Sequence, residues 1–278
     1  MKVLYFDCTN GISGDMLLNA LMELGECRAE FEAAIEMENF TAGRHNHDCD
    51  GANQHNQSSN HIVTHEHTNH GRSYHEVKYL IARSGFTRKS REYAAEIYRN
   101  IAEAEAEVHG ETLETIHFHE VGRDQAIKNA LGIGMAMEKI APDRTAVSPI
   151  YDGKGTIICS HGEIPVPVPA VRALMKKSTF VFRQVDVDTE MVTPSGLAGL
   201  IGIGAEPEGS GAGAQAECSG LGTQVECSGI GVQPVDFGNE AAGCQYQPSS
   251  DTIIKETEVH GARATGRGGL KAYLLRIE

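Results

Sequence analysis

The stretch Lys2-Val-Leu-Tyr-Phe-Asp7, followed by Asn10-Gly-Ile-Ser-Gly-Asp-Met16, predicts the fold class. Residues 2–7 are apolar enough for a buried strand, the glycines allow a tight turn, and an apolar helix is expected over 17–24. A strand, a glycine-rich turn and a helix N-terminus are typical of α/β proteins, which place chemistry at the carboxyl ends of strands. Asp7 is therefore a candidate catalytic residue.

The same turn offers an anion site, because free backbone N–H groups at a helix N-terminus point toward a negatively charged ligand. Gly11 and Gly14 permit the turn, Ser13 can cap the helix, and Asp15 is a candidate base. The glycine spacing matches neither the Walker nor the dinucleotide-binding fingerprint. A plain, capped turn between strand and helix is the alternative.

Composition limits the possible partners. The 278 residues carry a formal net charge of −14, which argues against nucleic acid or an acidic membrane surface as a partner. No run of about 18 apolar residues is present, and the N-terminus shows no signal-peptide pattern. The seven cysteines lack the CxxC spacing that would predict a structural zinc site or a disulfide framework. We therefore expect a cytoplasmic protein.

Histidines are concentrated in one polar segment. Eight of the 13 histidines fall between His45 and His75, and residues 41–71 contain so few core-forming side chains that we expect a disordered loop. Imidazole binds nickel, copper and zinc, so this loop is interpreted as an accessory metal-gathering segment. Its candidate ligands are His65, His67 and His70. A low-complexity insert that binds metal only as any polyhistidine does is the alternative.

A second group of ligand-type residues lies in Glu114-Thr-Ile-His117-Phe118-His119-Glu120-Val-Gly122-Arg-Asp124. In a strand, alternate side chains share a face, so His117 and His119 would face a cleft and Phe118 the core. In a helix, His117 would instead share a face with Glu120 and with the carboxylate four residues further on. Both geometries make His117, His119 and Glu120 candidate metal ligands, and Glu120 is also a candidate base. A partly exposed, polar strand end is the alternative.

The other elements follow from apolar periodicity and from turn residues. Helices are predicted over 28–38, 73–81, 89–109, 125–140 and 170–177. Strands are predicted over 145–150, 185–188, 252–260 and 271–277, with a short strand after Gly153. Within 89–109 the apolar stripe is interpreted as core alone; it consists of Tyr93, Ile97, Ile101, Ala104 and Val108.

Two further turns carry candidate site residues. His161 stands beside a glycine and before the proline-rich run 164–169, so it is a candidate base in a pocket. An ordinary loop histidine is the alternative. Glu190-Met-Val-Thr-Pro-Ser-Gly196 leads into another helix, where Thr193 and Ser195 could help to bind an anion.

The composition changes beyond Ile203. Three copies of a Ser-Gly-x-Gly-x-Gln unit recur with a period of nine residues, starting at Ser210, Ser219 and Ser228. Three copies cannot build a solenoid, so we expect a low-complexity insert. The expected architecture is α/β, a mixed sheet flanked by helices. The expected domain covers 1–203, carries the insert at 204–250, and is completed by closing strands in 251–278.

Five motifs, in this order, resemble the LarC nickel-insertion family. They are Asp7 with Asn10-Gly-Ile-Ser-Gly-Asp-Met16, Arg72-Ser-Tyr74 after the His-rich loop, His117-Phe-His-Glu-Val-Gly122, His161-Gly-x-x-Pro-Val-Pro-x-Pro169, and Glu190-x-Val-Thr-Pro-Ser-Gly196. The resemblance covers most of residues 1–203 and the closing strands.

The resemblance implies insertion of nickel into pyridinium-3,5-bisthiocarboxylic acid mononucleotide, a CTP-dependent chelatase (lyase-type) reaction that also uses a divalent cation. The product is the nickel-pincer nucleotide cofactor of lactate racemase and related enzymes. Such a reaction needs exchangeable nickel ligands, a site for the nucleotide phosphate, and a base that removes the ring proton. The candidates are His117, His119 and Glu120 for nickel, the 11–16 turn for phosphate, and Asp7, Asp15, Glu120 or His161 for the base.

The chain also differs from the family's pattern. Where the family often shows two aspartates after the HFHEVG motif, this chain has Gln125 and Asn129, and Asp124 could partly substitute for them. Family members continue into a smaller C-terminal domain associated with CTP, so the expected partner is a separate C-terminal LarC-type domain or a second copy of the chain.

Two other functions are open. One is a non-catalytic nickel carrier or storage protein that uses the His-rich loop. The other is a phosphatase-like hydrolase that uses Asp7 and the anion turn. The hydrolase is disfavoured, because no second phosphate-binding lysine follows at a suitable place.

Overall fold

The protein is built on a five-stranded mixed sheet. The structure is a computed structural model, and it describes residues 1–38, 71–159, 162–209, 248–261 and 267–277. The strand order is β10-β11-β1-β4-β9. In that order the strands span Ile253–Val259, Leu270–Arg276, Lys2–Asp7, Arg144–Val147 and Glu206–Pro207. β1 is parallel to β4 and antiparallel to β11. The predicted α/β architecture, including its mixed sheet and both closing strands, is confirmed.

The two faces of β1 bury different groups of side chains, because successive residues of a strand point to opposite faces. Leu4 and Phe6 belong to the large core that the helices share. Val3 and Tyr5 point the other way, into a small cluster completed by residues of β4 and β11. The main core therefore lies between the sheet and the helices.

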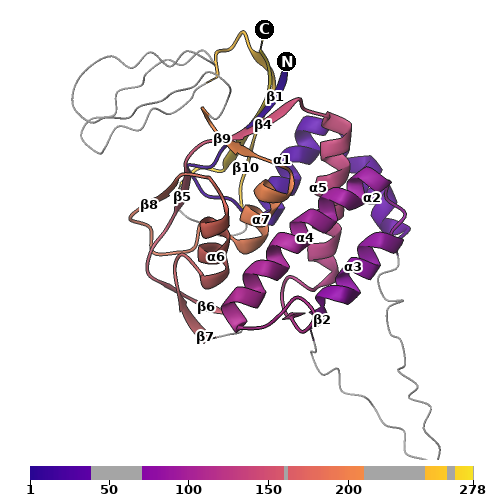
Figure 1. Ribbon diagram of the computed structural model, residues 1–278. Helices are drawn as coiled ribbons and strands as arrows, with labels where there is room; N and C mark the ends of the chain where they lie inside the picture. The colour runs from indigo at the N-terminus through magenta and orange to yellow at the C-terminus, as the bar shows by residue number, and fades with distance from the viewer. Residues whose placement is uncertain (39–70, 160–161, 210–247, 262–266, 278) are drawn as a thin grey trace, which may run out of the picture.

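The helices form a layer against the sheet (Figure 1). They are α1 (Gly14–Gly25), α2 (Arg28–Glu36), α3 (Tyr74–Arg83), α4 (Arg88–His109), α5 (Asp124–Ile140), α6 (Pro169–Lys177) and α7 (Pro194–Gly202). The long helix α4 packs against α5, α6 and α7, and α1 packs against α5. A Cβ at Gly134 would stand 2.2 Å from the carbonyl oxygen of Ser90, so α5 can approach α4 this closely only with glycine there.

Short strand pairs lie outside the main sheet. They are β2 (Arg72–Ser73) with β3 (His117–Phe118), β5 (Ile150–Asp152) with β8 (Phe182–Gln184), and β6 (Thr156–Cys159) with β7 (Gly162–Pro165). The single strand predicted over 145–150 is wrong, because the chain leaves β4 at Ser148-Pro149 and starts β5 at Ile150. Pro149 has no N–H group with which to continue the ladder.

The strand predicted over 185–188 is also misplaced. The structure has β8 at Phe182–Gln184 instead. Beyond it, the N–H of Val187 donates to the carbonyl of Val185 at 2.9 Å, and the N–H of Thr189 to that of Val187 at 2.9 Å. The segment also bonds to the end of β5 and the residue after Gly153, from the N–H of Val185 to the carbonyl of Asp152 at 2.9 Å and from the N–H of Lys154 to the carbonyl of Val187 at 2.8 Å, but it does not form a regular strand.

Two predicted features lie outside the described residues: most of the His-rich loop, at 39–70, and most of the low-complexity insert, at 210–247. The described helices include none that is both long enough and apolar enough to cross a bilayer.

Candidate functional site

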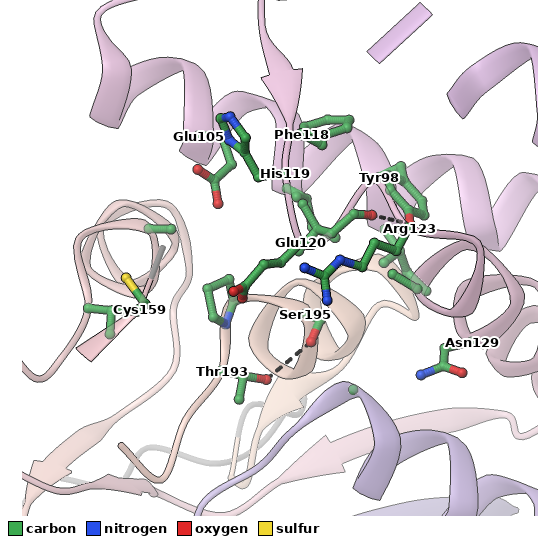
Figure 2. A pocket seen from close by; sticks show the side chains of 18 of the residues that line it. Tyr98, Glu105, Phe118, His119, Glu120, Arg123, Asn129, Cys159, Thr193 and Ser195 are labelled. Carbon is green, nitrogen blue, oxygen red and sulfur yellow. Dashed lines mark hydrogen bonds between the residues drawn. The ribbon is translucent and has the colours of Figure 1, made fainter. Parts of the chain in front are cut away.

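A cavity of about 490 Å³ lies between the helices and the loops that follow β3 and β6. Its wall is built by α1, α4, α5, α6 and α7, by the segment 117–121, and by the hairpin of β6 and β7. A concave site with a mainly apolar lining and a few converging polar groups is the usual form of a small-molecule site. Figure 2 shows part of this wall.

Several helix N-termini meet at the cavity. Its lining includes Gly14 at the start of α1, Arg123 at the N-cap of α5, Pro169 at the start of α6 and Pro194 at the start of α7. The N-terminus of an α-helix behaves as roughly half a positive charge. Four of them around one cavity favour an anionic ligand.

The N-termini of α1 and α7 are joined through the turns that precede them. The N–H of Ile12 donates to the carbonyl of Met191 at 2.9 Å, and the N–H of Thr193 donates to the carbonyl of Ile12 at 3.0 Å. Gly11 has a φ of +83°, and a Cβ there would stand 2.2 Å from the carbonyl oxygen of Met191. The backbone contact between the two turns therefore requires glycine at this position.

Asp15 lies on the cavity wall in a short chain of hydrogen bonds. The side-chain amide of Asn129 donates to Oδ1 of Asp15 at 2.6 Å, and Gln125 donates to Oδ1 of Asn129 at 2.8 Å. All three residues line the cavity. The amides thus fix the rotamer of the Asp15 carboxylate.

Asp124 does not substitute for a carboxylate in the cavity. Its carboxylate pairs with the guanidinium of Arg72 at 2.5 Å, and it is not part of the cavity wall. The expectation that Asp124 could replace the family's aspartates is therefore wrong, because Arg72 holds this side chain away from the site.

The segment 117–119 is a strand end, as the first of the two geometries predicts, and not a helix. Phe118 is 1% exposed and packs against the ring of Tyr98, with ring centroids 6.0 Å apart. His117 and His119 are exposed and line the cavity. Nδ1 of His117 lies 2.7 Å from the carbonyl oxygen of Thr115. That contact places the ring proton on Nδ1, so the lone pair of Nε2 is available to a metal ion.

The candidate nickel ligands share the cavity without forming a closed site. His117, His119 and Glu120 all line it. Within the described ranges, however, no three His, Cys, Asp or Glu side chains stand together as a metal site. The predicted ligands His65, His67 and His70, and the predicted base His161, lie outside the described residues.

Three predicted residues are not part of the cavity wall: Asp7, Gly11 and Ser13. The hydroxyl of Ser13 accepts a hydrogen bond from the N–H of Met16 at 3.2 Å, so it caps α1 as expected. Oδ1 of Asp7 accepts hydrogen bonds from the N–H and the hydroxyl of Thr9 at 3.1 and 2.7 Å. Asp7 belongs to the same face of β1 as Tyr5. On that face the hydroxyl of Tyr5 donates to Glu208 at 2.7 Å. Burial of Glu208 and the nearby charge of Asp7 raise the pKa of the Glu208 carboxyl.

The cavity wall contains residues that the sequence did not single out. Glu190 is a wall residue although it is 6% exposed, and Arg123, Glu105 and Cys159 also line the cavity (Figure 2). Glu190 and Arg123 lie inside motifs quoted above, and that is the signal that could have identified them. Glu105 and Cys159 became candidates only because α4 and β6 both contribute to this cavity wall.

The turn that carries Glu190 is held by a buried carboxylate. Oδ1 of Asp152 accepts hydrogen bonds from the N–H groups of Met191 and Val192 at 2.9 and 3.1 Å. Burial raises the pKa of Asp152, and these hydrogen bonds oppose that shift. Asp152 therefore fixes the backbone from which α7 begins.

The apolar stripe of α4 is more than core. Ile97 and Ile101 are buried, yet they also line the cavity together with Val108, which is 38% exposed. The interpretation of this stripe as core alone was therefore wrong. α4 supplies an apolar wall on which a planar ring could pack.

Comparison with known proteins identifies the family. A family model described as nickel insertion protein matches residues 4–225, so the chain belongs to that family. Two proteins named pyridinium-3,5-bisthiocarboxylic acid mononucleotide nickel insertion protein are similar to it. The protein of Acetivibrio thermocellus is 34% identical over 208 residues, and that of Akkermansia muciniphila is 36% identical over 209. Each match covers 71% of this chain and 50% of the relative. No solved structure matches the chain.

Proposed function

We propose that this chain carries the cavity in which nickel is inserted into pyridinium-3,5-bisthiocarboxylic acid mononucleotide, the compound in the names of both relatives. The observation that carries the proposal is the composition of one cavity. Two histidines and Glu120 lie on the same wall as four helix N-termini. Cation ligands and an anion-binding surface thus face one space, as the joining of a metal ion to an anionic nucleotide requires.

Nickel enters this account as a substrate. His117 and His119 would receive it through imidazole nitrogen, with Glu120 as an oxygen ligand. An insertion site has to release its metal, so a few exchangeable protein ligands serve it better than a closed set of four. The two thiocarboxylates of the nucleotide would complete the coordination, since nickel also accepts sulfur ligands.

The chemical step exchanges a proton for a metal ion. A ring carbon loses its proton to a base and bonds to nickel, while both sulfurs bind the same ion, so no electron is transferred. Asp15 and Glu120 are the described carboxylates on the cavity wall that we propose as the base. Asp7 and His161 are the other candidates from the sequence.

The nucleotide phosphate would lie at the first turns of α1 and α7. Gly14, Thr193 and Ser195 line the cavity there, and a Cβ at Gly14 would meet Oγ of Ser195 at 2.8 Å. Gly11 and Ser13 would act indirectly, by shaping and capping the turn. Backbone N–H groups and hydroxyls are suitable donors to a phosphate.

We further propose that catalysis requires a CTP-binding partner and a divalent cation. The chain spans about half the length of the curated relatives it matches. We propose that the CTP-binding part is a separate C-terminal LarC-type domain or a second copy of the chain, in the cytoplasm. Within this chain we propose one domain, 1–203 with 251–278, interrupted by the insert at 204–250.

A mass-spectrometric assay of the nickel-containing nucleotide tests the proposal. The protein is supplied with the precursor, CTP, saturating nickel and the C-terminal half of a relative. His117→Ala combined with His119→Ala should abolish product formation, while His260→Ala, at an exposed residue just after β10, should not. Full activity of the double variant would refute the cavity as the insertion site.

The alternative, a non-catalytic nickel carrier, rests on the histidines between His45 and His70. Deleting residues 44–70 separates the two functions. If the chain inserts nickel, the deletion should lower nickel loading yet leave product formation at saturating nickel unchanged. A loss confined to the loop deletion, with a normal double variant, would support the carrier.

A further inference from the structure

We propose that Arg123 binds the substrate's phosphate, in an anion subsite shared with Ser195 and the first turn of α7. The proposal deepens the proposed function, on which it rests, by assigning one negative group of the nucleotide to one side chain. The ligand class is a phosphate monoester, since a mononucleotide carries one.

The first support is the charge distribution of the cavity. Arg123 is the only Lys or Arg side chain among the described residues that line it, whereas Asp15, Glu105, Glu120 and Glu190 contribute carboxylates. Among the described residues, its guanidinium has no hydrogen-bond or ion-pair partner. Figure 2 shows this guanidinium pointing into the cavity on the side of Ser195 and Thr193.

The second support is the rigid backbone around Arg123. The hydroxyl of Tyr98 donates to the carbonyl of Val121 at 2.7 Å, and Arg72 donates to the carbonyl of Gly122 at 2.8 Å. Arg72 also pairs with Asp124 on the other side of Arg123, at 2.5 Å. Both neighbours of Arg123 are thus fixed while its own side chain projects into the cavity. Such preorganisation lowers the ordering cost of binding.

The third support is the set of donors opposite the guanidinium. Ser195 lies in the first turn of α7, and its hydroxyl is 3.2 Å from that of Thr193. A phosphate placed there would meet hydroxyl donors and a helix N-terminus, together with the planar fork of an arginine, whose geometry matches two phosphate oxygens. At its N-cap, α5 has no side-chain hydrogen bond, so Arg123 is not engaged in capping.

Calorimetric titration with two probes tests this assignment in the full chain without nickel. Nicotinic acid mononucleotide and nicotinic acid riboside share the pyridinium ring and the ribose and differ in the phosphate. Arg123→Gln should raise the Kd for the mononucleotide about 10- to 100-fold, as expected for losing a charge-assisted bidentate contact. The Kd for the riboside should not change, and Arg123→Lys should give an intermediate Kd for the mononucleotide.

Arg276→Gln is the matched control, because Arg276 is exposed at the end of β11 and is not part of the cavity wall. It should bind both probes as the wild type does. Equal losses for both probes in Arg123→Gln would overturn the proposal, and so would an unchanged mononucleotide Kd or a wild type that binds neither probe. If the loss in Arg123→Gln depends on the phosphate, but the wild type inserts no nickel even with CTP, saturating nickel and the C-terminal half of a relative, the subsite stands and the proposed function is refuted.

Discussion

At the scale of single residues, the cavity depends on positions where only one side chain fits. Gly11 combines a φ of +83° with a backbone neighbour that leaves no room for a Cβ. The sequence indicated a tight turn here, but not which glycine contacts a distant segment. That contact, with Met191, involves a residue 180 positions further along the chain, so no local pattern could predict it.

We predict that Gly11→Ala lowers the free energy of unfolding by about 2 to 4 kcal/mol, from backbone strain together with a clash. Gly110→Ala is the matched control. Gly110 also has a positive φ, of +66°, but a Cβ there would meet nothing within 4 Å. The control should cost only about 1 kcal/mol. Urea denaturation of both variants measures the difference. Equal losses in the free energy of unfolding would contradict the close contact between Gly11 and Met191.

Asp152 makes stability depend on pH. Burial raises its pKa in the folded protein, so the folded state binds the proton more tightly than the unfolded state does. The stability that this proton provides is present at low pH and is lost as the pH rises through the folded pKa. Asp152→Asn removes the titration while keeping an oxygen for the N–H groups of Met191 and Val192.

The free energy of unfolding of the wild type should therefore fall relative to Asp152→Asn as the pH rises from the ordinary carboxyl range, and the difference should become constant above the folded pKa. Urea denaturation of both proteins between about pH 4.5 and 8 measures this. A difference that grows in favour of the wild type with rising pH would contradict the assigned shift.

At the scale of elements, most helices were predictable, because apolar stripes and caps are local features. The capping residues Ser13, Ser73 and Thr193 start α1, α3 and α7. Short strands were harder to predict. β2 and β3 contain two residues each. They pair only because the segments that contain Arg72 and His117, which are distant in the sequence, come together in the folded chain.

Arg72 fixes the loop between β3 and α5. It bonds the carbonyl of Gly122 and the carboxylate of Asp124 with different nitrogens of one fork. Arg72→Lys keeps the charge but loses this geometry. We predict faster amide hydrogen exchange in residues 117–124, with little change in α1. Arg88→Lys, at a side chain that is 88% exposed and pairs with Glu92, should leave exchange unchanged, and an identical pattern in both variants would contradict this role of Arg72.

At the scale of the whole molecule, the site is a product of topology. The sequence identified four of its parts separately: the turn at 11–16, the segment 117–120, the proline-rich run and the turn at 190–196. It did not show that the helices starting at these places all direct their N-termini into one cavity. Nor did it show that Asp7 would lie on the face of β1 away from the helical core. Which face of a strand turns toward the helices is set by packing in the folded chain.

X-ray absorption at the nickel edge tests the central claim, that nickel and the nucleotide meet in this cavity. The sample is a chain lacking residues 44–70, with one equivalent of nickel and the precursor. The account predicts a nickel shell with both imidazole and sulfur scatterers, and loss of the imidazole component in His117→Ala with His119→Ala. An imidazole component that persists in the double variant would contradict the account. So would a nickel shell without sulfur in the loop-deleted chain that keeps both His117 and His119.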